Sequence, residues 1–293
     1  YDPNYNPALS WTFPFSGRIL FEAGVSAQIL NQNDTRADGV SSKTYRIVDQ
    51  GLNLTYGNVA TRTVPRRQYQ ERFAMSVITG RHNFKTGFNA RRTSQGNPSL
   101  GFDGEMNGPG VDYRFNNGVP NQLALRDAPW QFQESLSDVA LFVQDQWTMG
   151  KITLQGALRF DHAWSYSPDQ TIGVTNFLAS PLSFARADGV NYKDISPRMG
   201  VAWDVFGNGK TAVKVNAGRY EDPASNLNNN YSISNPIARI ATTTTRTWTD
   251  TNKNFVPDCN LQTQAANGEC AAGSNQPFGT ATPITAAIDP ALI

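Results

Sequence analysis

Several segments of this 293-residue sequence alternate apolar and polar side chains with a period of two over ten or more positions. In the segment 19–29 the odd positions are apolar or small, from Ile19 to Ile29, whereas the even positions include Glu22 and Gln28. A period of two places successive side chains on opposite faces of a β-strand. Because ordinary strands average about five or six residues, the pattern predicts unusually long strands with one apolar and one polar face.

Short turns join these segments into hairpins. The clearest alternation runs from Lys151 to Asp161, with apolar residues or Gly at the even positions. The turn Phe206-Gly-Asn-Gly-Lys210 carries the Gly and Asn residues that positions with positive φ favour. Three hairpins follow, joining 69–79 to 83–93, 139–147 to 152–160, and 199–205 to 211–217.

The connections at the opposite strand ends are long and polar, at 95–134, 163–194 and from 221 onward. Short turns on one side and long loops on the other are typical of bacterial outer-membrane barrels. Tilted strands of about ten residues span the hydrocarbon, and a closed sheet leaves no unpaired backbone in lipid. We therefore predict an all-β fold, an antiparallel transmembrane β-barrel with long extracellular loops, whose apolar face meets lipid and whose polar face lines the lumen.

The predicted strands number about eight to ten, including a weaker pair at 44–56 and 233–248. The loops are too long for a small closed barrel, so the segment is interpreted as part of a larger one. The chain begins at Tyr1 without a signal peptide, which we interpret as an internal piece of a longer protein.

Composition narrows the partners. The chain carries 25 basic and 24 acidic side chains, so it has no broad positive field for nucleic acid, and none is expected as a partner. No apolar run reaches the 18 or more residues that a spanning helix needs, so contact with membrane lipid is expected through strands.

Several motifs resemble one receptor family when they are taken in order. The sequence is similar to the TonB-dependent outer-membrane receptors, in particular the Oar-like branch with an N-terminal carboxypeptidase-regulatory-like domain. The motifs cover most of residues 16–220 and are Val77–Phe88, Tyr113–Pro120, Ala140–Trp147 (ALFVQDQW), Ile152–Asp161 (ITLQGALRFD), Ser196–Asp204 and Gly207–Thr211.

The resemblance implies a barrel of about 22 strands, an N-terminal plug inside it and a segment that recruits the TonB complex. Neither plug nor TonB-contacting segment is recognisable here, so the match is to the middle of a barrel. Residues 1–293 are then one barrel segment, with mostly transmembrane hairpins in 1–220 and a largely extracellular loop in 221–293.

One loop pattern is a candidate metal site. Asp250, Asn252, Asn254 and Asp258 occupy positions 1, 3, 5 and 9 of a calcium-loop spacing, as in thrombospondin type 3 repeats, and these oxygen side chains suit calcium. Phe255 stands where such loops usually have Gly. An ordinary Asn/Asp turn is the alternative interpretation.

The two cysteines lie close together in a polar stretch after this segment. A disulfide between Cys259 and Cys270 is expected for an oxidising compartment and would stabilise the loop by about 3 kcal/mol. Two free thiols are the alternative. The spacing does not match a zinc motif.

No set of residues suggests catalysis, so the protein is not expected to be an enzyme. His82 is predicted in a turn and His162 just after a strand end, and neither has a Ser and acid partner at a suggestive spacing. Several basic side chains are predicted to face the lumen, where they could contact a plug or an anionic solute. The alternative is that they pair with other lumenal side chains and are solvated. They are Arg91, Arg159, Arg198, Lys210 and Lys214.

These patterns predict an outer-membrane barrel, and the resemblance implies a receptor that takes up a scarce solute of unknown class (siderophore, carbohydrate or peptide) with TonB-derived energy. A passive porin or adhesin-like barrel is the second hypothesis. A secreted glycan-binding β-sandwich is the third, because alternation alone does not identify lipid.

Overall fold

The computed structural model describes residues 4–34, 38–41, 43–58, 62–99, 110–127, 130–221 and 240–281. In this part of the chain, fifteen strands form three sheets. No helix among these residues has the length and apolar character needed to cross a membrane.

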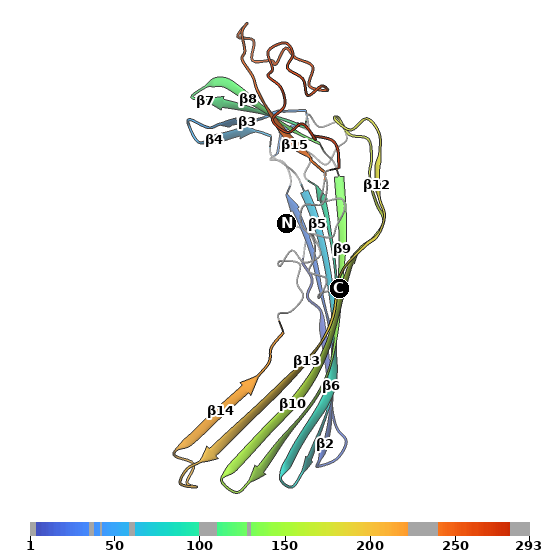
Figure 1. Ribbon diagram of the computed structural model, residues 1–293, viewed down its shortest axis with the longest axis vertical. Helices are drawn as coiled ribbons and strands as arrows, with labels where there is room; N and C mark the ends of the chain where they lie inside the picture. Colours follow the sequence, from blue (N-terminus) through green and yellow to red (C-terminus); the bar gives the residue numbers. More distant parts are fainter. Residues whose placement is uncertain are drawn as a thin grey trace.

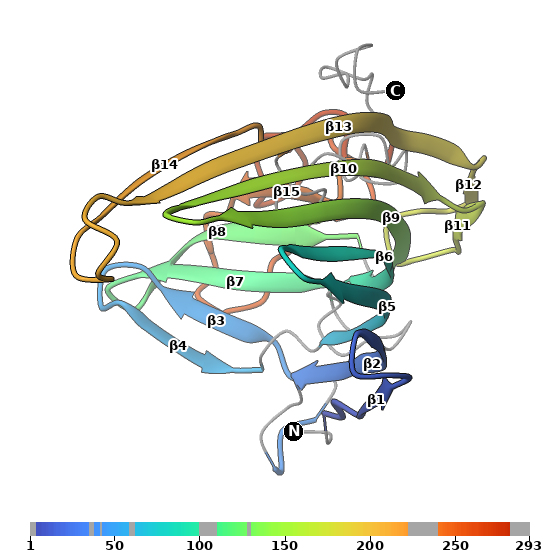
Figure 2. The same cartoon turned by 90° about the horizontal axis from the view of Figure 1, so that it is seen from below.

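The largest sheet has eight strands, and every neighbouring pair in it is antiparallel. Figures 1 and 2 show that it is long and curved, like part of a barrel wall. The predicted all-β fold of long antiparallel strands is therefore confirmed, as an open part of a barrel. The strands in spatial order are β1 (Ala8–Pro14), β2 (Ile19–Asp34), β5 (Arg62–Thr79), β6 (His82–Ser99), β9 (Trp130–Met149), β10 (Ile152–Ser167), β13 (Ala187–Asp204) and β14 (Ala212–Gly218).

The strand bounds refine the sequence predictions. The turn between β5 and β6 contains only residues 80–81, so His82 is the first residue of β6 rather than part of the turn. His162 lies inside β10, because this strand continues beyond the apolar band. Lys210 lies in the turn 205–211 and not on the lumenal wall.

A second sheet, here called the cap, lies at the end of the large sheet opposite the short turns (Figure 1). Seen from below, its strands lie within the curve of the large sheet (Figure 2). In spatial order they are β15 (Thr243–Thr247), β8 (Val119–Arg126), β7 (Val111–Asn116), β3 (Arg46–Asp49) and β4 (Leu54–Gly57).

The prediction of barrel strands at 44–56 and 233–248 was therefore wrong. The described parts of both segments belong to the cap, as β3 with β4 and as β15. Strands of four or five residues extend about 13–17 Å, which is too short to cross the hydrocarbon. Residues 233–239 lie outside the described residues.

The cap has a hydrophobic core of its own. Leu123 and Leu125 of β8 are completely buried, and Trp248 packs beside them at 1% exposure. A small third sheet of β11 (Gln170–Ile172) and β12 (Leu182–Phe184) adds a further cluster with Leu178 and Ile240. The extracellular loops thus form a packed structure above the barrel wall.

Candidate functional site

The outward face of the large sheet is apolar and uncovered. Met199 is 65% exposed, Val215 64% and Leu141 54%. Phe73 stacks between Phe21 and Phe88, with ring centroids 6.1 and 6.2 Å apart, so an aromatic row crosses β2, β5 and β6 on this face. A soluble sandwich would bury these side chains against a second sheet, and the described residues provide none.

The short-turn end of this face has an aromatic rim. Trp147 stacks on His82 with ring centroids 5.4 Å apart, and His82 Nδ1 lies 2.6 Å from Asp145 Oδ2. Amphipathic aromatic side chains favour the membrane–water interface. Asp145 lies on the same face as Trp147, two positions before it, and His82 is the partner of its Oδ2 atom near the edge of the apolar band.

The opposite, lumenal face carries paired charges. Lys85 Nζ lies 2.6 Å from Glu22 Oε2, and this pair crosses from β6 to β2. Arg91 Nε lies 2.6 Å from Asp138 Oδ2, which joins β6 to β9. Arg159 pairs with Asp161 on the same strand. Arg91 and Arg159 thus lie on the lumenal face as predicted, and each has a carboxylate partner that the sequence did not identify.

A groove of about 670 Å³ runs along this lumenal wall. Small residues of β1 and β2, among them Ser10 and Gly24, leave the space, and Arg72, Arg91 and Arg159 line it. The Arg72 side chain lies over Gly24, where an added Cβ would meet its Nε at 2.8 Å. Arg72 is exposed, and none of the ion pairs between described residues involves it.

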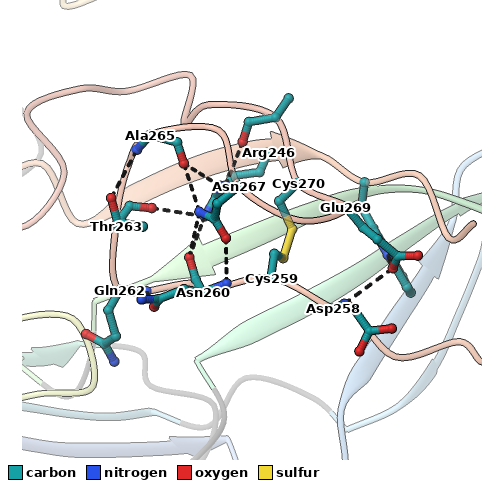
Figure 3. Close-up of a disulfide and its surroundings, with 12 residues drawn as sticks. Arg246, Asp258, Cys259, Asn260, Gln262, Thr263, Ala265, Asn267, Glu269 and Cys270 are labelled. Atoms are coloured by element: carbon teal, nitrogen blue, oxygen red, sulfur yellow. Dashed lines mark hydrogen bonds between the residues drawn. A yellow bond between two sulfur atoms is a disulfide. The ribbon is translucent and has the colours of Figure 1, made fainter.

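Above the groove, one buried arginine organises the cap. Arg246 is fully buried and donates four hydrogen bonds of 2.7–3.0 Å to backbone carbonyls (Figure 3). A guanidinium presents five donors in a rigid fork, which suits carbonyls arriving from several directions. The accepting residues are Asn260, Thr263, Ala265 and Ala271.

The loop around Arg246 is closed by a disulfide between Cys259 and Cys270, whose Cα atoms are 5.8 Å apart (Figure 3). Cys270 is buried in the cap core. Asn267 bridges the loop, since its side chain accepts the Asn260 N–H and donates to the Asn260 carbonyl. The covalent bond therefore ties the loop into the core.

The candidate calcium residues lie together in a tight turn, but they bond to one another. The amides of Asn252 and Asn254 both donate to Asp258 Oδ2, at 2.6 and 3.2 Å. Asp250 accepts the N–H groups of Asn254 and Phe255. Phe255 has φ 59°, so it adopts the left-handed conformation that Gly usually provides. The described residues hold no group of three or more His, Cys, Asp and Glu side chains suited to a metal, and calcium stays a prediction.

Sequence reasoning missed Glu269 beside this turn. Its carboxylate accepts hydrogen bonds from the hydroxyl and N–H of Thr251, from the N–H of Asp258 and from the Trp248 indole. These bonds, led by the Thr251 hydroxyl, lower the pKa of Glu269 to about 2. Glu269 is thus the anion that holds the turn against the cap.

A family model described as an outer membrane beta barrel domain matches residues 2–292. The chain therefore belongs to this family, and its place is the outer membrane. No curated protein and no solved structure matched the chain.

Proposed function

We propose that this chain is the barrel part of a TonB-dependent receptor that takes up a scarce solute through the outer membrane. The observation that supports the proposal most is the pairing of a folded cap with a polar lumenal groove. The cap has its own core and lies within the curve of the wall, and the groove of about 670 Å³ runs along the wall. An open pore needs no such cap.

The proposed role of the wall is binding and passage, without catalysis. Arg91 and Arg159 are held by carboxylates, so their charges are largely compensated. Arg72 has no such partner among the described residues and reaches over Gly24 into the groove. A solute with a negative or strongly polar group would contact Arg72 first, because its guanidinium requires no ion pair to be broken.

Energy coupling would come from a plug and a TonB-contacting segment elsewhere in the protein. The test is uptake by cells that carry the intact gene, with and without a functional TonB system. A receptor loses uptake at low external solute when TonB is lost. A passive barrel keeps its rate of solute uptake when TonB is lost. That result would contradict the receptor proposal and favour the porin-like alternative.

A pair of variants of the intact protein separates the groove from the rest of the wall. Arg72→Gln should raise the solute concentration for half-maximal uptake several-fold, because it removes the uncompensated cation of the groove. Lys214→Gln removes a lumenal cation of β14 outside the groove lining and serves as the matched control. Equal effects of both variants would refute a role for the groove.

Calcium binding by the turn is a separate proposal, made from the spacing of Asp250, Asn252, Asn254 and Asp258. Calorimetric titration of the intact protein with calcium tests it, comparing the unaltered protein with Asp250→Ala and Asp258→Ala. Heats that do not differ between the three proteins would remove calcium from the account.

A further inference from the structure

The outward face changes from apolar to charged at a common height above the short turns. On β6, Arg92 lies ten positions beyond His82, the first residue of the strand. On β10, His162 lies ten positions beyond Ile152, and on β13, Lys193 lies eleven positions before Asp204. Ten residues at about 3.3 Å each, tilted by about 40°, rise about 25 Å, which equals the usual height of the apolar band.

Arg92, His162 and Lys193 therefore mark the extracellular edge of the hydrocarbon on the lipid side. Strand alternation places Arg92, His162 and Lys193 on the same face as Phe88, Phe160 and Ile195, which are apolar. Arg92 has a paired neighbour on each side, in β5 and β9, and His162 has one in β9 and one in β13. Lys193 is paired with His162 on its β10 side and lies beyond the part of β13 that pairs with β14, which begins at Arg198.

A cleft of about 310 Å³ opens at this edge. Strand register places Tyr69, Arg92, Ser137 and Trp164 in one row across β5, β6, β9 and β10. Tyr69 and Trp164 stand at the two ends of the row, and Ser137 is buried at its floor. Arg92 is exposed in the cleft and has no ion pair with any described residue.

Two further side chains extend this surface. His162 and Lys193 are directly opposite each other on β10 and β13, and the His162 ring lies 4.8 Å from the Trp164 ring. We call Tyr69, Arg92, Trp164, His162 and Lys193 the boundary patch. Arg92 and Lys193 are three strands apart and two residues offset along the strands, about 16 Å in all. Two long side chains can reach toward one headgroup across this distance.

We propose that the boundary patch binds the phosphate groups of a lipid headgroup in the outer leaflet. A guanidinium forms bidentate, charge-assisted bonds with phosphate, and Tyr and Trp rings favour the headgroup level of a bilayer. The acyl chains of the same lipid lie against the apolar band directly below, over Phe73 and Phe88. Anchoring the lipid at both levels distinguishes this site from an exposed arginine.

One carboxylate bears on the site and sharpens its test. Glu71 lines the cleft and lies diagonally from Arg92, since it is opposite Ala90 in the register. Diagonal neighbours of this kind are about 7–8 Å apart. Its charge opposes phosphate binding, so Glu71→Gln should strengthen binding while Arg92→Gln weakens it. Opposite effects from two neutral replacements are not expected from loss of folding.

The experiment uses the intact protein, stripped of lipid in detergent and titrated with a bisphosphorylated glycolipid, with bound lipid counted by native mass spectrometry. Arg92→Gln should lower the apparent affinity about tenfold and Lys193→Gln about threefold, whereas Glu71→Gln should raise it. Lys214→Gln, on the lumenal face, is the control and should change nothing.

Two comparisons identify the ligand. The dephosphorylated form of the same glycolipid should bind at least tenfold more weakly, and inorganic phosphate should not compete at millimolar concentration, because it has no acyl chains. The proposal is overturned if the dephosphorylated lipid binds equally well, if inorganic phosphate displaces the lipid, or if Arg92→Gln binds as the unaltered protein does. Solute uptake plays no part in this readout, so it stands or falls apart from the proposed transport function.

Discussion

Arg246→Lys tests whether one buried guanidinium holds the cap together. Arg246 makes four hydrogen bonds to carbonyls that belong to the disulfide loop and the segment after it. Lysine has three donors on a single nitrogen, so it leaves at least one and, without the fork, two of the carbonyls unpaired. Each unpaired buried group costs about 1–3 kcal/mol, and the expected loss of cap stability is about 2–4 kcal/mol.

Hydrogen exchange measured by mass spectrometry on the intact protein in detergent reads this loss directly. At about 1.4 kcal/mol per factor of ten, the amides of residues 259–271 should exchange about 30- to 1000-fold faster. Arg114→Lys is the matched control, because Arg114 lies in the same cap but makes one hydrogen bond to the part of the chain that the structure describes, of 2.6 Å to Gln122. If the two variants accelerate exchange by similar factors, the reasoning about Arg246 is refuted.

Three further outcomes are expected. The folded pKa of Glu269 is about 2 and its ordinary value is 4.5, so its stabilisation is complete above about pH 4.5 and is lost as the pH falls toward 2. The protection of cap amides, taken relative to the intrinsic exchange rate at each pH, should therefore fall less steeply between pH 6 and 3 in Glu269→Gln, and equal slopes would contradict this. Gly268→Ala should prevent the disulfide hairpin from forming normally, since Gly268 has φ 50° and an added Cβ would collide with the Asp258 carbonyl. Gly209→Ala, at a positive φ with open space around it, should cost about 1 kcal/mol. Protease sensitivity of the cap distinguishes the two variants. Leu141→Arg on the lipid face should destabilise the barrel by about 2–4 kcal/mol, and Gln144→Arg on the lumenal face should destabilise it by much less. The free energy of unfolding is measured by urea titration of the protein in lipid vesicles, and the reverse order would argue against the assigned faces.

The membrane strands could be predicted because their pattern is local. The alternation in 152–160 predicted the first nine residues of β10, and the strand in fact continues to Ser167. Above the hydrocarbon the outward face no longer has to be apolar, as His162 shows, so the alternation stops before the hydrogen-bonded ladder does. Strand existence and face followed from sequence, whereas the extracellular ends did not.

The cap could not be predicted, because its pairings are not local. β3 runs parallel to β7, which follows more than 60 residues later, and β15 pairs with β8 from more than 100 residues away. Each strand has four to eight residues, too few for a clear period. Only the folded loops bring these segments together.

The same reason explains the missed site residues. Arg246 binds backbone carbonyls, which every residue has, so no sequence pattern predicts its partners. Glu269 reaches Thr251 only because the loop folds back by 18 positions. On the wall, the polar character of Arg91 was predictable, but its bond to Asp138 depends on the register between two hairpins.

In this fold the even-numbered side chains of β10 meet lipid and the odd-numbered ones meet the aqueous lumen. Single spin labels introduced at residues 152–161 of the intact protein in membranes test it by collision rates with oxygen, which concentrates in lipid, and with a water-soluble nickel chelate. The native cysteines are joined to each other and leave these positions as the label sites. Labels at even-numbered positions should collide with oxygen, and labels at odd-numbered positions should collide with the chelate. Collision rates that do not alternate would contradict this assignment of faces. Shielding of the even-numbered positions from both reagents would also contradict it.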